Sequence, residues 1–183
     1  MSLPSPGPTR PKTTAAVITA AVLAPLGGLV CGVISQLMAL ASVDALLLRV
    51  LFNTPISSPL RPRPLALVAM LVGFVVLAVI VVLVVWLVAR AASPRYGFAA
   101  LLFGGWIAAV LGGWLTALAT SPLVALDLGF RPEMVEQLVL QRISAGGGWG
   151  LYWGWLTGLA AAVVFLITNR SRRGGPVPAR PTL

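Results

Sequence analysis

The sequence contains no histidine, one cysteine and only four acidic residues among 183. The lack of histidine excludes bis-histidine haem ligation, histidine metal sites and acid–base catalysis by imidazole. The single cysteine, Cys31, excludes a disulfide within the chain and lies in an apolar run, where a thiol behaves as a small hydrophobe. No pair of carboxylates has a spacing that requires metal binding or paired acid–base chemistry. We therefore predict a protein that is not an enzyme and that has no catalytic residue, no metal site and no cofactor.

Charge is scarce as well: charged residues make up 9% of the chain, whereas hydrophobic residues make up 58%. Soluble domains carry roughly a quarter charged residues, so a soluble chain of this length could not bury so much apolar surface. The net charge of +9 is a property of many nucleic-acid-binding proteins. Here, however, the basic residues lie in tails and short connections, as they do where they anchor membrane spans. The sequence predicts the lipid bilayer as a partner and no nucleic-acid binding. The preference for arginine over lysine suggests a GC-rich, bacterial gene.

Four long apolar segments contain no Asp, Glu, Lys or Arg. Each has the ~20 residues that a helix needs to cross the hydrocarbon core, and in lipid the backbone must bond internally, which favours helices over strands. The first is longer than the 7–15 residues typical of a signal-peptide core, so we expect an uncleaved span. The sequence thus predicts an all-α integral membrane protein, a four-transmembrane-helix bundle within 14–169, with spans at about 14–41, 65–89, 98–119 and 148–168. Residues 1–13 and 170–183 are predicted to be a disordered N-terminus and a disordered basic tail.

The distribution of arginine and lysine predicts the orientation. The N-terminus, the second connection and the C-terminal tail together hold 8 basic residues, whereas the first and third connections hold 5. Because basic residues accumulate on the cytoplasmic side, we expect a multi-pass protein of the cell membrane with both termini in the cytoplasm.

The two connections on the predicted outer side are long for helix–helix connections. Residues 132–143 have Pro132 at a suitable first helical position, acids in the first turns and an apolar stripe. They predict a short interfacial helix on the outer surface or capping the bundle. Residues 43–52 predict a second interfacial helix, and the proline-rich residues 53–64 predict irregular structure.

A weak internal repeat relates residues 27–41 to residues 104–118 without gaps at an offset of 77. The double glycine and much of the apolar pattern match. One interpretation is two tandem helical hairpins related by an axis along the membrane normal, as occurs in transporters. The alternative is that apolar sequence of low complexity aligns easily with itself.

Small residues recur at a spacing of four in three of the four spans. Because apolar helices gain little from one another in lipid, they associate where small residues let their backbones approach closely. We therefore expect the first, third and fourth spans to form the packed interior, and the valine-rich second span to face lipid or a partner. The stretch "GGGWGLYWGWLTG" should provide such a face, unless Gly146–Gly148 are a flexible lead-in. The predicted helix-packing residues are Gly28, Gly32, Gly104, Gly105, Gly112, Gly113, Gly150, Gly154 and Gly158.

Few polar residues lie within the spans, and none of them is charged. Gln36, Thr116 and Thr157 are the candidates for polar contacts between helices, with Ser35 beside Gln36. The lack of an intramembrane charge argues against a proton pump or a transporter with a central carboxylate.

These features predict a non-catalytic polytopic membrane protein. We expect an accessory or structural subunit of a larger bacterial envelope complex, which contacts other membrane-protein subunits, or further copies of itself, through its small-residue helix faces. The alternative is a small transporter or channel for a weakly polar solute or a lipid.

Overall fold

The computed structural model describes residues 13–42, 46–56, 63–92 and 96–170. Within these ranges the chain forms the helices α1 (Thr14–Leu40), α2 (Leu46–Phe52), α3 (Pro64–Ala91), α4 (Gly97–Leu128) and α5 (Pro132–Arg170). All except α2 are long and apolar enough to cross a membrane. The prediction of an all-helical chain with four candidate membrane spans is therefore confirmed. The terminal segments predicted to be disordered lie, apart from Thr13 and Arg170, outside the described residues.

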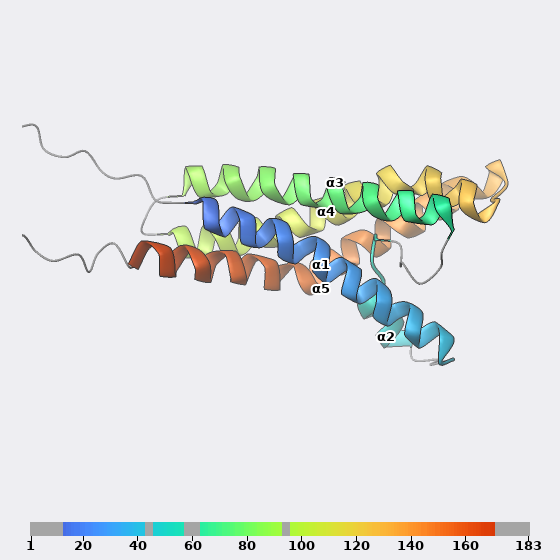
Figure 1. The fold of residues 1–183 in the computed structure, drawn as a ribbon, viewed down its shortest axis with the longest axis horizontal. Helices are drawn as coiled ribbons and strands as arrows, with labels where there is room; N and C mark the ends of the chain where they lie inside the picture. Colours follow the sequence, from blue (N-terminus) through green and yellow to red (C-terminus); the bar gives the residue numbers. More distant parts are fainter. Residues whose placement is uncertain (1–12, 43–45, 57–62, 93–95, 171–183) are drawn as a thin grey trace, which may run out of the picture.

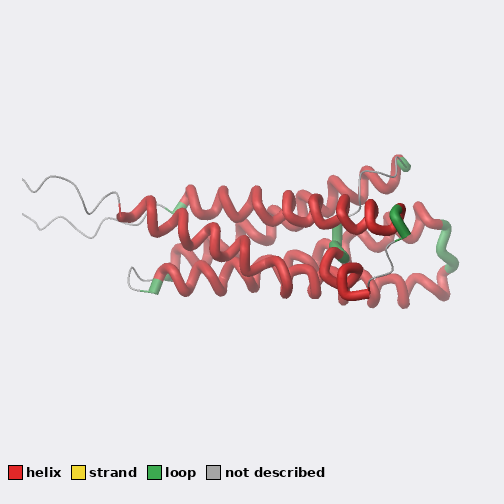
Figure 2. Tube along the Cα trace, turned by 90° about the horizontal axis from the view of Figure 1, so that it is seen from below, coloured by secondary structure: helices red, strands yellow, loops and turns green. Residues whose placement is uncertain are grey.

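The four long helices lie side by side along the long axis of the molecule (Figure 1). The first turn of α1 and the last turn of α5 lie at the same end, which we call the termini end. At the opposite end, the short connection of residues 129–131 joins α4 to α5 and is the outermost described part of the chain (Figure 2). We call this the hairpin end. Among the four long helices, α1 and α4 run from the termini end to the hairpin end, and α3 and α5 run back.

The hairpin of α4 and α5 is longer than predicted. The third span was expected to end near residue 119, but α4 continues through Pro122 to Leu128. Gly129 then ends the helix with a φ of 65°, a left-handed conformation that glycine adopts without strain. The predicted surface helix of residues 132–143 and the predicted span of residues 148–168 are instead one continuous helix of 39 residues.

Close packing explains why the predicted break within α5 does not occur. Gly146, Gly147 and Gly148 are all helical, and the first two are buried. Glycine weakens an isolated helix by about 1 kcal/mol relative to alanine. Here the neighbouring backbone of α4 supports the helix, because it approaches closely at Gly146. The interpretation of residues 146–148 as a flexible lead-in is wrong.

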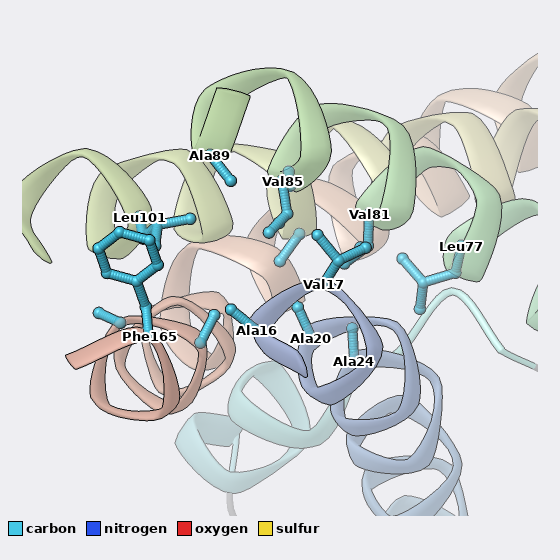
Figure 3. Close-up of a cluster of buried hydrophobic side chains, with 14 of the residues drawn as sticks. Ala16, Val17, Ala20, Ala24, Leu77, Val81, Val85, Ala89, Leu101 and Phe165 are labelled. Atoms are coloured by element: carbon cyan, nitrogen blue, oxygen red, sulfur yellow. The ribbon is translucent and has the colours of Figure 1, made fainter. Parts of the chain in front are cut away.

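Each long helix buries a row of residues spaced four apart, and apolar side chains of these rows form the core. On α3 the row runs through Ala69, Gly73, Leu77, Val81, Val85 and Ala89. The rows of α1 and α3 point toward one another, and Leu101 and Phe165 lie at one end of the same cluster (Figure 3). A spacing of four advances about 40° around a helix at each step, since a turn takes 3.6 residues. Such rows favour helices that cross one another, as the i±4 ridges of packed helices do.

The second span does not simply face lipid, and that part of the packing prediction is wrong. Val81 and Val85 have no exposed surface at all, whereas Val79 is 56% exposed. One face of α3 therefore belongs to the interior, where it packs against α4 and α1. The valine-rich composition hid this face, because hydrophobicity alone does not separate lipid-facing from core-facing valines.

The hairpin end of α1 leaves the bundle. Its residues up to Gly32 alternate between buried and exposed positions, but none of the residues from Val33 to Leu40 is fully buried. The short α2 packs against α1 and α5. It forms the described part of the predicted helix at residues 43–52, and residues 43–45 of that prediction lie outside the described residues.

Candidate functional site

Glycines of α4 and α5 lie against the backbone of the other helix along a line that we call the glycine seam: Gly105 and Gly113 on α4, and Gly146, Gly150 and Gly158 on α5. All of these except Gly146 are among the predicted helix-packing residues. A Cβ atom on Gly105 would lie 2.5 Å from Cα of Gly158. Glycines 113 and 146 face one another in the same way, each backbone against the carbonyl of the other. Gly154 lies beside the seam, where an added Cβ atom would lie 2.6 Å from that of Ala109. The seam therefore occupies the small-residue face of α5 within the chain itself.

The two glycine pairs of α4, Gly104–Gly105 and Gly112–Gly113, each face two different helices. Gly105 and Gly113 belong to the seam with α5, whereas Gly104 and Gly112 face α3. A Cβ atom on Gly104 would lie 2.8 Å from a methyl group of Val88, and one on Gly112 would lie 2.6 Å from a methyl group of Leu77. Bulky side chains of α3 thus fill the hollows that these glycines leave, and α4 becomes the central helix of the bundle.

The glycines of α1 have different neighbours from their counterparts in the aligned repeat. Gly28, which aligns with Gly105, lies against the side chain of Ile56, at 2.8 Å from an ideal Cβ atom. Gly32 is buried and lines a pocket. Gly28 contacts a side chain, whereas its counterpart Gly105 contacts backbone of α5. The arrangement as tandem hairpins therefore stays a prediction.

A non-helical segment, residues 53–56, inserts between the helices at the hairpin end. Pro55 and Ile56 are buried, with Ile56 only 2% exposed. The hydroxyl of Thr54 donates to the carbonyl of Gly28 at 3.0 Å and accepts from the backbone N–H of Ile56 at 3.3 Å. Buried backbone polar groups need hydrogen-bond partners, and these bonds meet part of that need.

A chain of polar side chains extends from α3 to this inserted segment. Thr116, one of the predicted polar-contact residues, is fully buried, with its hydroxyl 3.5 Å from the carbonyl oxygen of Gly73 on α3. One turn further along α4, the hydroxyl of Thr120 donates to the carbonyl of Thr116 at 2.8 Å. Thr120 then accepts a hydrogen bond of 3.0 Å from Arg142 of α5. The same nitrogen of Arg142, Nη2, donates to the carbonyl of Pro55 at 3.1 Å.

A pocket of about 310 Å³ opens where α1 leaves the bundle. Gln36 and Ser35 line it from α1, whereas Asn53 and Thr54 line it from the inserted segment. On the far wall, Nη1 of Arg63 lies 3.8 Å from Oδ2 of Asp127 and donates to that residue's carbonyl at 3.0 Å. The pocket thus places the most polar residue of the spans, Gln36, near an ion pair at the hairpin end.

A second, smaller pocket of about 200 Å³ lies on the other side of Asn53 and Thr54. Leu138, Gln141, Arg142 and Ala145 of α5 form the rest of its lining. The inserted segment therefore separates two polar spaces, one beside α1 and one beside α5.

The third predicted polar-contact residue, Thr157, does not line either pocket. It is 4% exposed and lies in the α4–α5 contact, where its backbone carbon would be 3.7 Å from a Cβ atom on Gly105. Of the three predicted residues, Gln36 lines one of these two pockets, whereas Thr116 and Thr157 line neither. No group of three or more His, Cys, Asp or Glu side chains that could hold a metal ion occurs among the described residues.

Sequence reasoning identified Ser35 and Gln36 of the first pocket but missed Asn53, Thr54 and Arg142. Asn53 and Thr54 fall in a segment that was expected only to be irregular, and Arg142 was weighed only as a topology signal. A signal was present in the sequence, because Arg142 is the last charged residue before the charge-free stretch of α5 and Asn53 directly follows an apolar helix. No protein-family model, curated protein or solved structure matches the chain, so these contacts are the basis for any functional assignment.

Proposed function

We propose that this protein is a non-catalytic, multi-pass subunit of a larger bacterial envelope complex, with an accessory or structural role. It lies in the cell membrane with both termini in the cytoplasm and the hairpin end outside. The length of the α4–α5 hairpin is the observation that carries this proposal.

The hairpin is too long to be contained in a bilayer. With 39 residues, α5 extends over about 58 Å at 1.5 Å per residue. A bilayer measures only about 40–45 Å even with its headgroups. If the predicted span of residues 148–168 crosses the hydrocarbon, then residues 132–147 extend about 24 Å beyond it. Much of this extension stands outside the membrane.

Large apolar side chains are exposed on this extension and on the adjoining part of α4. Leu126 is 70% exposed, Leu140 is 62% exposed and Met134 is 48% exposed. In lipid such exposure is ordinary, but in water large apolar surface is typical of sites that a partner covers. The exposed carboxylates of Glu133 and Glu136 lie on the same segment. The partner that fits is another membrane-protein subunit with an apolar surface bordered by basic residues.

The sequence suggested that the small-residue helix faces contact the partner, but in the structure these faces are occupied within the chain. Gly105, Gly150 and Gly158 contact backbone of the same chain. A partner helix could reach them only by displacing α4 or α5. The partner contact is therefore assigned to the hairpin rather than to the glycine seam.

The test is extraction in a mild neutral detergent, followed by measurement of the mass and composition of the particle. We expect the protein to elute with a second chain at fixed stoichiometry. The double variant Leu126→Ala, Leu140→Ala should lose that chain. The control variant Ile107→Ala, Ile167→Ala should keep it, since both residues are exposed within the apolar spans. A wild-type protein that is a lone monomer or a homo-oligomer in every detergent that keeps it folded would refute the assignment.

A second candidate function, a small transporter for a weakly polar solute or a lipid, is favoured by the pocket lined by Ser35 and Gln36. Leu77, Val81 and Val85, which have no exposed surface, fill the core of the bundle beyond it. Transport would therefore require these helices to move apart. Uptake by vesicles that contain the purified protein, abolished by Gln36→Leu, would support this function over the first.

A further inference from the structure

Arg142 carries a charge that no described acidic side chain compensates. It is half-buried, and its guanidinium donates hydrogen bonds to a carbonyl and a hydroxyl of described residues. Burial of a cation is costly unless an anion accompanies it. A half-buried arginine without a carboxylate is therefore a candidate to receive an anion from outside the chain.

The hydrogen bonds of Arg142 leave donors free on one side. A guanidinium has five N–H donors, and both described hydrogen bonds use Nη2. Nε is buried without a partner. Nη1 makes no hydrogen bond to any described residue and, unlike Nε, is not completely buried. Its two N–H groups are therefore left for a ligand.

The pocket beside Arg142 has the size and lining of an anion site. Its volume of about 200 Å³ equals several water molecules at ~30 Å³ each. Asn53 and Gln141, whose amide groups can donate hydrogen bonds, line it together with Arg142, and none of its described lining residues is acidic. Arginine binds phosphate through paired, charge-assisted hydrogen bonds, so this donor set suits a phosphate group better than a cation.

The position of Arg142 along α5 also suits phosphate. It lies six residues before Gly148, where the predicted membrane span begins, which is about 9 Å along the axis. The headgroup layer on each side of a bilayer is about 5–8 Å thick, from the difference between the hydrocarbon and total thicknesses. If residues 148–168 cross the hydrocarbon, the backbone of Arg142 lies about 1–4 Å beyond this layer, next to the lipid headgroups.

We propose that Arg142, Asn53 and Gln141 form a phosphate-binding site in this pocket, which receives either the headgroup of an anionic phospholipid or a free phosphate. The site goes beyond the proposed subunit function and does not depend on a partner. Bound phosphate would neutralise Arg142 while its Nη2 continues to hold the inserted segment through Pro55.

Two probes applied to the purified full-length protein distinguish the sources. The first is release of the protein from vesicles of equal phosphatidylcholine and phosphatidylglycerol, with the retained lipids counted by native mass spectrometry. The second is calorimetric titration with inorganic phosphate in neutral detergent. Binding in the first assay alone identifies a lipid headgroup, and binding in the second identifies free phosphate. Either result supports the site, and no binding of either probe overturns it.

Three variants make the test specific to the pocket. Arg142→Gln should weaken binding about tenfold to a hundredfold, the loss expected for one charged hydrogen-bonding group at 1.5–3 kcal/mol. The control Arg131→Gln removes an equal charge from an exposed position outside the pocket and should bind like the wild type. Asn53→Leu alters the pocket lining while it leaves both described hydrogen bonds of Arg142 in place, and it should weaken binding about tenfold.

Equal binding by Arg142→Gln and the wild type would overturn the proposal, as would an equal loss in Arg131→Gln. If Arg142→Gln fails to fold because the inserted segment loses its anchor, Asn53→Leu decides, and unchanged binding by that variant overturns the proposal.

Discussion

The contact between α4 and α5 makes a quantitative prediction that one methyl group can test. Gly158 lies on the glycine seam, where an added Cβ atom would overlap the carbonyl oxygen of Leu102 and would lie 3.1 Å from the backbone nitrogen of Trp106. These are backbone atoms, which cannot rotate away. Gly158→Ala must therefore separate the two helices.

A matched control lies in the same helix. Gly148 has no atom within 4 Å of an ideal Cβ position, so Gly148→Ala adds the same methyl group to open space. Alanine is favoured over glycine within a helix by about 1 kcal/mol, and this gain applies to both variants. Overpacking costs about 1–3 kcal/mol and applies only to Gly158→Ala. The free energies of unfolding of the two variants should differ by that amount.

The assay is unfolding of the purified protein in mixed micelles with an increasing fraction of sodium dodecyl sulfate, followed by circular dichroism. We expect Gly148→Ala to unfold at the same or a higher fraction than the wild type, and Gly158→Ala at a lower one. Equal midpoints for the two variants would show that α4 and α5 are not in backbone contact, and the reasoning about the seam would be wrong.

Two further substitutions test the other helix contacts. Val81→Ala should lower the free energy of unfolding by about 1–3 kcal/mol, because the side chain is fully buried between helices. Val79→Ala should change it by less than about 0.5 kcal/mol, because that side chain is exposed. Equal effects in the micelle assay would show that α3 has no buried face. Trp153→Phe removes the hydrogen bond of 2.7 Å from the indole to the carbonyl of Leu51, a loss of about 1 kcal/mol. Amide exchange in α2 should become faster in this variant and stay unchanged in Trp155→Phe, whose side chain is 45% exposed; slow exchange in both would mean that α2 is held by other contacts.

The candidate spans could be read from the sequence because length and the absence of charge identify apolar helices almost without regard to packing. Their ends were less predictable. Pro122 and the glycines at 146–148 are locally unfavourable to helix, yet both α4 and α5 continue through them. Gly146 rests on the backbone of α4, and a contact between distant parts of the chain is not visible in local sequence.

The pocket residues were hidden for a related reason. Gln36 stood out as the most polar residue of the first span, but its neighbours Asn53 and Asp127 come from a connection and from the far end of α4. Arg142 is adjacent to Thr120 only because α4 and α5 form a long hairpin. The sequence supplies the chemical groups, whereas the hairpin geometry brings them together.

The proposed partner contact at the hairpin can be tested most directly by cross-linking at single positions in intact membranes. A photoreactive amino acid would replace Leu140 on the exposed hairpin or, in the control, Val75, which is 60% exposed on α3. We expect one discrete cross-linked product from position 140, of fixed mass and containing a second membrane protein, and no such product from position 75. A product only between copies of this chain, or none at position 140 although the labelled protein is folded and inserted, would contradict it.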